Sequence, residues 1–393
     1  MKTVDDFDFK NKKALIRVDF NVPLNEKNEV IDYTRIRSAK KTIQKVLNDG
    51  GAVVLMSHLG RPEGKESKYS LENIVSKVKK VLDTEIKFTE DCIGSKAFAA
   101  SENLKMGEVL LLENLRFHKE EKEGDENFAK ELARHGDIYV NDAFGTAHRA
   151  HASTAVIAKF FEEKCFGYLM TDEIENIDKA LNSKEKPVTA ILGGAKISSK
   201  ITVIENILDN IDNLIIGGGM SYTFIKAQGG RIGNSLVQEE YENTALEILR
   251  KAEEKNVKVY LPKDAIVADE FAANANLHVE QIGSISEPWM GLDIGPATIK
   301  EFSEVIEKSK ILLWNGPMGV FEFDNFSGGT KAIGLAVGEA TQKGAFSLVG
   351  GGDSVAAVKK FNLGHKVSYI STGGGAMLEM LEGKTLPGIA AIA

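Results

Sequence analysis

Residues 346–360 read Phe-Ser-Leu-Val-Gly-Gly-Gly-Asp-Ser-Val-Ala-Ala-Val-Lys-Lys, and this stretch decides the fold class. Its first four residues form a short apolar run typical of a buried strand, and three glycines follow, where the backbone can turn sharply. The residues from Ser354 to Lys360 have the spacing of a helix. A buried strand, a glycine turn and a helix in this order form the repeating unit of a parallel α/β sheet.

The same succession of apolar runs and helical stretches occurs along the whole chain. Up to residue 170, strands are predicted at Ala14–Val22, Ala52–His58, Glu108–Glu113 and Asp137–Asn141, and helices at Arg35–Asn48, Leu71–Leu82 and Glu126–Arg134. Further on, strands are predicted at Val188–Leu192, Asn213–Ile216, Val257–Pro262, Ile311–Trp314, Phe346–Val349 and Val367–Ile370, and helices at Ser198–Leu208, Glu239–Lys255, Thr298–Lys308 and Ser354–Lys360. This alternation predicts an α/β protein with parallel sheets covered by helices on both faces.

The length of the chain indicates two domains. A chain of 393 residues exceeds the usual size of a single hydrophobic core. We place the boundary within Gly167–Lys186, where Thr171–Leu181 has the pattern of an amphipathic connecting helix. The predicted domains are therefore residues 1–170 and residues 171–379.

Composition and charge argue against two classes of protein. No apolar run reaches the length of a transmembrane helix, so no membrane partner is expected. The first 170 residues carry equal numbers of basic and acidic side chains, and the remainder supplies the whole net charge of −8. Neither half has the basic character of a nucleic-acid binder. The charged segment Met1–Lys13 lacks a signal-peptide pattern, and Cys92 and Cys165 form no paired motif, so we expect a cytoplasmic protein.

Arginine and glycine are distributed unequally along the chain. Seven of the nine arginines lie before residue 150, whereas 27 of the 37 glycines lie after residue 170. Arginine binds phosphate and carboxylate groups through two parallel hydrogen bonds. Clustered glycines leave backbone amides free to approach a phosphate, or bare main chain for a base or ribose. The distribution favours a two-ligand protein that holds a small anion in its first half and a nucleotide in its second.

Four predicted strands of the first half end in side chains that suit an anion. These ends are Asp19–Asn21 with Arg35 nearby, Ser57–Pro62, Glu113–Phe117 and Asn141–Arg149. If the strands are neighbours, the side chains converge at the carboxyl edge of the sheet, where open α/β sheets bind ligands. His148 and His151 have a spacing that permits a metal pair, but no third ligand stands nearby, so hydrogen bonding to an anion or a structural use is preferred.

Predicted strands of the second half end in glycine clusters instead. The clusters are Gly193-Gly194-Ala195-Lys196, Gly217–Gly219, Asn315–Gly319, Gly350–Ser354 and, in a second helix-opening segment, Ser371–Gly375. Because Gly350–Ser354 opens a helix, its free amides suit a phosphate, and Asp353 is placed to reach Mg²⁺. Lys196 and Lys200 are four residues apart, so we expect them to share a helix face and to point at phosphates.

Two other functions stay open at this point. A dinucleotide dehydrogenase needs G-x-G-x-x-G, but Tyr222 and Val355 occupy the last position of the two candidate matches. Gly383-Lys384-Thr385 is similar to the end of a P-loop, but Leu378 stands where the first glycine is required. The other alternative, a two-lobed anion receptor without catalysis, would not need paired lysines together with the cluster before the helix at Ser354.

The segment Arg17-Val18-Asp19-Phe20-Asn21-Val22-Pro23 resembles the N-terminal signature of the phosphoglycerate kinases. Seven further segments resemble motifs of that family and occur in its order: Ser57–Pro62, Glu113–Phe117, Asn141–Arg149, Gly193–Lys200, Trp314–Glu322, Gly350–Ser354 and Ser371–Ala376. The resemblance covers essentially the whole chain. It implies two Rossmann-like lobes, each a parallel sheet flanked by helices, joined by a hinge helix at residues 171–181. The tail of about 380–393 would pack back on the first lobe.

The resemblance also implies an activity. It is the reversible transfer of a phosphoryl group between 1,3-bisphosphoglycerate and MgADP, giving 3-phosphoglycerate and MgATP, in glycolysis and gluconeogenesis. The implied enzyme is a monomer that closes by hinge bending, with Mg²⁺ as its cofactor.

The implied site residues fall into three sets. The triose would be held by Asp19, Asn21, Arg35, His58, Leu59, Gly60, Arg61, Arg116 and Arg149. The nucleotide would be held by Gly193, Ala195, Lys200, Gly217, Gly218, Gly291, Asn315, Pro317, Val320, Glu322, Gly351, Gly352, Asp353 and Ser354, with Asp353 toward the metal. The catalytic set would be Arg35, Lys196, Lys200, Gly373 and Gly374. One position departs from the family pattern, since Ser199 stands where an aspartate is common.

No general base is expected for this reaction. In the direction that consumes ATP the nucleophile is a carboxylate, which is already ionised at neutral pH. Catalysis then consists of positioning the reactants and neutralising the charge of the phosphoryl group in transit. We expect Arg35 and Lys200 to do this from different lobes, so that the lobes must close. The hinge candidates are Thr171–Leu181 and Gly373–Gly383.

Overall fold

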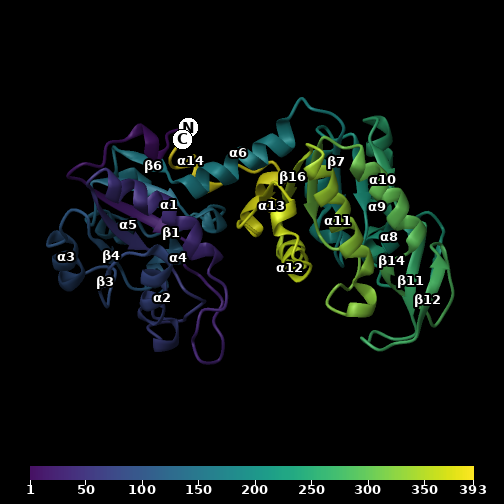
Figure 1. Cartoon of the computed structure of the whole chain (residues 1–393), viewed down its shortest axis with the longest axis horizontal. Helices are drawn as coiled ribbons and strands as arrows, with labels where there is room; N and C mark the ends of the chain where they lie inside the picture. Colours follow the sequence, from purple (N-terminus) through teal and green to yellow (C-terminus); the bar gives the residue numbers. More distant parts are fainter. The chain divides into compact units, whose positions relative to one another are not determined.

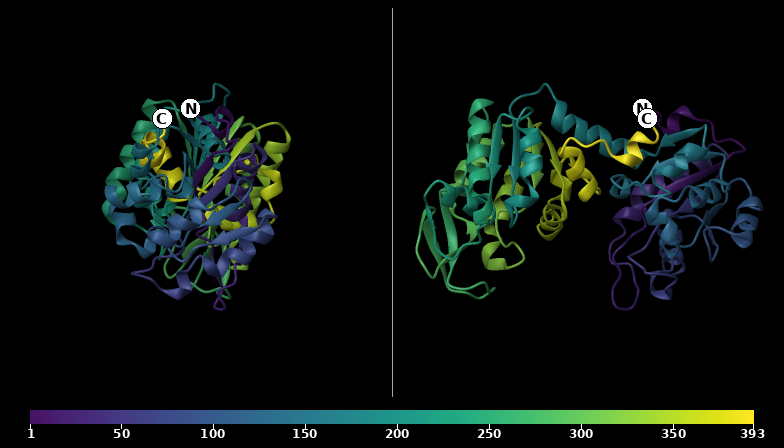
Figure 2. Two further views of the ribbon diagram at one scale, coloured as in Figure 1. Left: turned by 90° about the vertical axis from the view of Figure 1, so that its left-hand side faces the viewer. Right: turned by 180° about the vertical axis from the view of Figure 1, so that it is seen from behind.

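The computed structural model describes residues 1–393, and the chain divides into two compact units. Unit 1 comprises Met1–Ile174 and Thr385–Ala393, and unit 2 comprises Glu175–Lys384. Both chain ends therefore belong to unit 1, where Figures 1 and 2 draw them near each other. None of the helices is both long enough and apolar enough to cross a bilayer.

Unit 1 is built on a six-stranded parallel sheet with the strand order β3-β4-β2-β1-β5-β6. Its strands are β1 (Lys13–Val18), β2 (Ala52–Met56), β3 (Ile86–Phe88), β4 (Val109–Leu111), β5 (Ile138–Asp142) and β6 (Lys164–Phe166). Every residue of β2, β4 and β5 is buried, as is typical of a parallel sheet with both faces covered. The four strands predicted to end in anion-binding residues are adjacent in this sheet.

Short helices cover the sheet of unit 1. They are α1 (Thr34–Asn48), α2 (Glu72–Leu82), α3 (Ser95–Glu102), α4 (Lys119–Glu123), α5 (Glu126–Ala133) and α14 (Pro387–Ala390). On α1, the apolar residues Ile36, Ile43 and Val46 recur at helical spacing and pack into the same core as Ile16 of β1.

Residues near the end of the chain are joined to the rest of unit 1 by hydrogen bonds to the backbone of Gly388. The Nδ2 of Asn141 donates a hydrogen bond to the carbonyl of Gly388 (3.1 Å), and the amide of Gly388 donates to the carbonyl of Ala147 (2.8 Å). A Cβ at Gly388 would lie 3.0 Å from the Cα of Ala147, so the bare backbone is what allows this approach. The connecting helix α6 (Tyr168–Asn182) contains the division between the units, which falls after Ile174.

Unit 2 contains a second six-stranded parallel sheet, in the order β10-β8-β7-β15-β16-β17. Its strands are β7 (Val188–Leu192), β8 (Asn213–Ile216), β10 (Lys258–Tyr260), β15 (Ile311–Asn315), β16 (Phe346–Val349) and β17 (Tyr369–Ile370). The helices of unit 2 besides the shared α6 are α7 (Ile201–Ile207), α8 (Ser221–Ala227), α9 (Glu242–Glu254), α10 (Pro296–Glu307), α11 (Gly328–Gln342), α12 (Gly352–Lys360) and α13 (Gly375–Leu381). The predicted α/β fold with parallel sheets flanked by helices is confirmed.

Unit 2 also carries an antiparallel sheet that the sequence patterns did not predict. Its order is β12-β11-β14, with β11 (Asp264–Ala268) between β12 (Leu277–Gln281) and β14 (Met290–Ile294). A further short pair joins β9 (Arg231–Ile232) and β13 (Ser284–Ile285). Figure 2 (right) shows the long green strands of this sheet at the edge of unit 2.

Several predicted elements have different bounds in the structure. The strand predicted over Ala14–Val22 ends at Val18, because the amide of Phe20 donates to the side chain of Ser57 (2.8 Å) instead of continuing the sheet. The helix predicted over Ser198–Leu208 is wrong at its start. A 3₁₀ turn, η6 (Ile197–Ser199), precedes α7, and Lys200 lies between them with φ −125°.

Candidate active site

The predicted anion-binding residues of unit 1 lie where the four adjacent strands β4, β2, β1 and β5 end. Asp19 and Asn21 follow β1, and the amide of Gly60, after β2, donates to Oδ1 of Asn21 (2.8 Å). Arg35, near the start of α1, pairs its Nη1 with Oδ2 of Asp19 (2.8 Å) and donates to the carbonyl of Asn21 (3.0 Å). The loops after β1 and β2 and the first turn of α1 are therefore tied together by polar contacts.

Arg116 joins the loop after β4 to this cluster. Its Nη1 donates to the carbonyl of Gly60 (2.7 Å), and its backbone amide donates to Oδ1 of Asn114 (3.0 Å). The Nδ2 of Asn114 donates in turn to the carbonyl of Leu59 (2.8 Å). Burial, together with the charges of Arg149 and Arg17, lowers the pKa of Arg116 to about 10.

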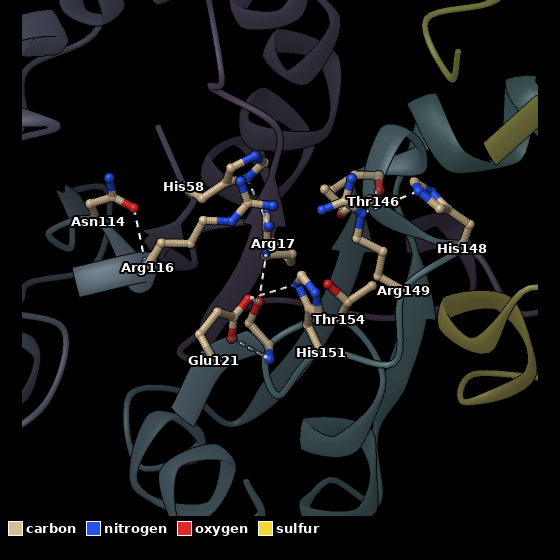
Figure 3. A network of polar contacts seen from close by, with 12 residues as sticks. Arg17, His58, Asn114, Arg116, Glu121, Thr146, His148, Arg149, His151 and Thr154 are labelled. Carbon is tan, nitrogen blue, oxygen red and sulfur yellow. Dashed lines mark hydrogen bonds and ion pairs between the residues drawn. The ribbon is translucent and has the colours of Figure 1, made fainter. Parts of the chain in front are cut away.

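Two predicted arginines are less tightly held. Arg149, on the loop after β5, donates from Nε to Nε2 of His148 (3.2 Å), and Figure 3 shows this pair beside the other arginines. Arg61 is exposed and lines a cavity of about 480 Å³ together with Tyr69. Arg61 makes no hydrogen bond or ion pair with another site residue.

A buried polar network lies beneath this surface, and Figure 3 shows it in close view. Arg17, only 1% exposed, contacts His58 and Ser153, and Ser153 contacts the fully buried Glu121. Burial and the charges of Arg17, Arg116, Arg35 and Arg149 hold the pKa of His58 well below its usual value. The same kinds of cause lower the pKa of His151 to about 4.

The electrostatics of this site favour an anion. The two depressed histidine pKa values have the same causes, which are burial first and then the charges of the surrounding guanidinium groups. Asp19 and Glu121 balance only part of that positive charge. A bound phosphate or carboxylate would supply the rest, through the bidentate contacts that arginine makes best.

Unit 2 contains a cavity of about 450 Å³ formed largely by bare backbone and apolar side chains. The predicted nucleotide-binding residues that line it are Ala195, Gly218, Gly291, Pro317, Val320, Glu322 and Asp353. A Cβ at Gly218, where φ is +66°, would lie 2.6 Å from the backbone nitrogen of Gly194. Only glycine can occupy this position without displacing the main chain.

A second cavity in unit 2, of about 320 Å³, adjoins the first, since both are lined by Gly194, Ala195 and Asp353. The predicted residues around it are Gly193, Ala195, Lys196, Lys200, Asn315, Gly351, Gly352, Asp353 and Ser354. An apolar cavity that continues into a smaller one lined by lysine and glycine has the layout that a base, a ribose and a phosphate chain require.

The two predicted lysines both line the second cavity, but their predicted helical pairing is wrong. Lys196 is an exposed residue in extended backbone (φ −129°, ψ 128°), and Lys200 precedes α7, so they do not share a helix face. Lys200 is the more buried of the two, and its Nζ donates to Oδ1 of Asn315. Burial lowers the pKa of Lys200, although the charges of Asp353 and Glu382 act in the opposite direction.

The glycine cluster before α12 has the conformation predicted for it. Gly351 has φ +89° and precedes the first turn, and a Cβ there would lie 2.7 Å from Nδ2 of Asn315. The hydroxyl of Ser354 accepts a hydrogen bond from the amide of Gly316 (2.6 Å), which joins this helix end to the loop after β15. Asp353 lies in the first turn, exposed, and makes no hydrogen bond or ion pair within the protein.

Three predicted residues lie outside both cavities. A Cβ at Gly217 would lie 2.3 Å from Sδ of Met318, so this glycine serves packing behind the cavity wall. The amide of Gly373 donates to Oγ of Ser371 (3.1 Å), and Gly374 has φ +49° before α13. The amide of Gly373 is therefore already paired within the protein.

Residue patterns alone missed part of both sites. In unit 2, Tyr222, Asp264 and Asp293 line the larger cavity, and two of them lie on the antiparallel sheet that was not predicted. In unit 1, Glu121 and Ser153 carry no motif. Glu121 lies in the wholly charged helix α4, so its burial cannot be distinguished in the sequence from the exposure of its neighbours.

Comparisons with known proteins agree on one family. The family model described as phosphoglycerate kinase matches residues 4–384. The phosphoglycerate kinase of Porphyromonas gingivalis is 52% identical over 415 residues, covering 99% of both chains. The cytosolic phosphoglycerate kinase of Nicotiana tabacum is 50% identical over 385 residues, covering 98% of this chain and 96% of the relative.

A chloroplastic relative and a solved structure extend this agreement. The chloroplastic phosphoglycerate kinase of Volvox carteri is 50% identical over 387 residues, covering 98% of this chain and 84% of the relative. The structure of phosphoglycerate kinase from Coxiella burnetii aligns with a TM-score of 0.91 and 40% identity, over 99% of this chain and 98% of that one. The chain belongs to the phosphoglycerate kinase family.

Proposed function

We propose that the cationic site of unit 1 binds the triose and that the two adjoining cavities of unit 2 bind the nucleotide. As a member of its family, the chain catalyses the reversible glycolytic transfer of a phosphoryl group between 1,3-bisphosphoglycerate and ADP, giving 3-phosphoglycerate and ATP. The proposal assigns each half of that reaction to named residues. The observation that carries it is the convergence of four adjacent strand ends on one arginine-rich edge of the sheet in unit 1.

On this proposal the triose anion replaces an internal partner of Arg35 and leaves the internal contact of Arg116 in place. Arg35 exchanges its contact with Asp19 for the ligand, and Arg116 keeps Gly60 in place through its carbonyl. The full set proposed for the triose is Asp19, Asn21, Arg35, His58, Leu59, Gly60, Arg61, Arg116 and Arg149.

The base and ribose would occupy the larger cavity of unit 2, and the phosphates the smaller one. The adenosine is assigned to Gly218, Gly291, Pro317, Val320 and Glu322, with Gly193 and Gly217 supporting the wall. The phosphates are assigned to Lys200, Asn315 and the amides of Gly351–Ser354, because free amides at a helix N-terminus favour negative charge.

Mg²⁺ fits this arrangement at Asp353. The carboxylate is exposed, lines both cavities and makes no hydrogen bond or ion pair in the protein. Mg²⁺ is usually held by one or two carboxylates together with substrate phosphates. When bound, the ion would neutralise charge on the phosphate oxygens.

The residues of the chain then have a positioning and charge-neutralising task. Arg35 and Lys200 would contact the phosphoryl group in transit, with Lys196 and the Gly373–Gly374 segment as helpers. The accepting carboxylate is ionised at neutral pH, so no side chain needs to remove a proton. Water must be excluded to prevent hydrolysis of the reactive acyl phosphate.

Because the two proposed binding sites belong to separate units, we propose that the enzyme closes by hinge bending about α6 and the Gly373–Gly383 segment. We also propose that it acts as a cytoplasmic monomer.

Small-angle scattering tests the closure: compaction is expected only with 3-phosphoglycerate and nucleotide together. The same compaction with nucleotide alone would contradict the two-ligand closure.

The decisive experiment is a coupled assay of ATP formation from 1,3-bisphosphoglycerate and MgADP. The wild-type chain should form ATP, and Lys200→Ala should not do so at a comparable rate. Calorimetry with 3-phosphoglycerate on Lys200→Ala serves as the control for folding and should give wild-type affinity. Loss of triose binding in that variant would contradict the assignment of the two ligands to the two units.

A further inference from the structure

Arg17 is a buried arginine with three directed hydrogen bonds and almost no exposed surface. Its Nε donates to Oγ of Ser153 (2.9 Å), its Nη1 donates to the carbonyl of Val18, and its Nη2 contacts Nδ1 of His58 at 3.2 Å. Arg17 is 1% exposed, and each of its three side-chain nitrogens already has a partner inside the protein. All of its side-chain hydrogen bonds are therefore made within unit 1.

The opposite end of the network anchors Arg17 to a buried carboxylate. Oγ of Ser153 accepts from Arg17 and donates to Oε1 of Glu121 (2.6 Å), while the amide of Ser153 donates to Oε2 of Glu121 (2.9 Å). Figure 3 shows Arg17 between His58 on one side and Glu121 on the other. A continuous chain of donors and acceptors therefore runs from Glu121 through Ser153 and Arg17 to His58.

The direction of this chain determines which nitrogen of His58 carries the proton. A guanidinium has only donors and stays protonated, so Nδ1 of His58 must accept the hydrogen bond from Arg17 and cannot carry a proton. A neutral imidazole has its single proton on the other nitrogen, here Nε2. No group of the protein accepts a hydrogen bond from Nε2 of His58, which leaves this donor for a ligand.

We propose that Arg17 is a positioning residue that holds His58 as the neutral Nε2–H tautomer, so that His58 presents one fixed hydrogen-bond donor to the bound triose anion. The step to the triose rests on the proposed function, whereas the tautomer can be measured without substrate. Arg17 acts through His58 and does not touch the ligand itself.

Burial and the surrounding guanidinium groups keep His58 neutral. Burial has the largest effect, and the charges of Arg17, Arg116, Arg35 and Arg149 also disfavour a second proton on the ring. His58 is therefore a neutral donor whose contribution to binding does not change with pH over the physiological range. A histidine with an ordinary pKa could gain a proton when an anion binds beside it, whereas His58 stays neutral.

Nitrogen NMR of the full-length protein labelled in histidine tests the tautomer directly. The chain has seven histidines, and His58→Gln identifies the signals of His58. In the wild type we expect an unprotonated Nδ1, a protonated Nε2 and no titration between about pH 5.5 and pH 8. In Arg17→Met we expect both tautomers and a higher pKa of His58, because the largest cause after burial is removed. A wild-type ring that carries its proton on Nδ1, or that titrates near its ordinary pKa, overturns the proposal.

A double-mutant cycle tests whether Arg17 acts through His58. Arg17→Met should raise the KM for 3-phosphoglycerate about 10-fold with kcat changed much less, because a hydrogen bond to a charged ligand is lost. In a His58→Gln background the same substitution should change KM by less than about 3-fold, since the group it positions is gone. Equal effects in both backgrounds would mean that Arg17 acts by its charge alone, and would overturn the proposal.

Controls keep the outcome interpretable. Arg37→Met removes an exposed arginine of the same unit that stacks on Tyr33, and should leave both the tautomer and KM unchanged. If Arg17→Met does not fold, Ser153→Ala breaks the same chain between Arg17 and Glu121 and should increase the fraction of the second tautomer. If the tautomer is as proposed but His58→Gln binds 3-phosphoglycerate as the wild type does, the assignment of His58 to the triose fails and the tautomer assignment stands.

Discussion

The site proposed in unit 1 is built from charged side chains, whereas the site proposed in unit 2 depends mainly on glycines, which have no side chain. In unit 1, Arg35 and Arg116 are held by carbonyls and a carboxylate, and burial together with the surrounding charge lowers the pKa of His58. In unit 2, Gly218 and Gly351 are required because any Cβ would collide with a neighbouring group. Function in unit 1 should therefore be lost when a charged side chain is removed. The site of unit 2 should be disrupted when a glycine is given a Cβ.

The largest effect is expected from Arg35→Ala in unit 1. Removing this guanidinium should reduce kcat on the order of 10³-fold, by analogy with arginines that stabilise phosphoryl transfer, while ADP affinity barely changes. Steady-state turnover and ADP calorimetry measure the two quantities. Near-normal turnover would remove Arg35 from catalysis.

Lys200→Ala tests the more buried of the two lysines that line the smaller cavity of unit 2. Its loss should reduce kcat by roughly 10²- to 10³-fold, because a donor aimed at developing phosphate charge is removed. Lys196→Ala is the matched control, since Lys196 is exposed and lines the same cavity, and it should cost clearly less. Equal losses in the two variants would contradict the difference in burial as the basis for their roles.

Gly218→Ala tests the role of the missing side chain. The added Cβ would meet the main chain of Gly194 at a residue with φ +66°, so the free energy of unfolding should fall by about 2–4 kcal/mol. Gly352→Ala is the control for stability, because nothing lies within 4 Å of a Cβ at that position. Urea unfolding of both variants measures the difference. A stable Gly218→Ala would mean that the loop can shift and that its glycine serves another purpose.

The smallest effects concern pH, and they should have opposite signs in the two units. The pKa of His151 in unit 1 is lowered to about 4, so the folded state loses stability as the pH falls from about 6.5 to about 4, when the unfolded chain binds the proton first. Burial raises the pKa of Asp293 in unit 2 to about 7, so the stability that this group contributes is present below about pH 4 and is lost as the pH rises to about 7.

Two substitutions test these two pH dependences separately. His151→Gln should flatten the acid-side loss of stability, and Asp293→Asn should flatten the loss toward neutral pH, each over its own pH window. Denaturant titrations at half-unit pH intervals measure both. The absence of any change in slope would mean that these two groups are protonated alike in the folded and unfolded chains.

The parallel sheets and most of the strand-end residues could be predicted from the sequence because their signals are local. An apolar run followed by glycine or by Asp-Phe-Asn identifies the end of a buried strand without knowledge of its neighbours. Val188–Leu192 and Phe346–Val349 were predicted with the bounds that the structure has. The convergence of the arginines was then a consequence of which strands are adjacent.

The elements that were missed depend on distant contacts. The helix α11 begins with two glycines and contains Gly334 and Gly338, which lower helix propensity. These glycines are needed because Trp314, Leu363 and Lys366 pack directly on the helix, which no local pattern reveals. The same holds for the network of Arg17, whose partners Ser153 and Glu121 come from more than a hundred residues away.

The contact between Gly388 and Asn141 has a consequence for the order of folding during synthesis. Unit 2 is one continuous segment, Glu175–Lys384, whereas unit 1 needs Thr385–Ala393 as well. Residues 385–393 are synthesised only after all of unit 2. Domains generally fold as units while the chain is being made. The unit that begins first is therefore completed last, because a nascent chain lacks the contacts of Gly388 with Asn141 and Ala147 until unit 2 has been translated.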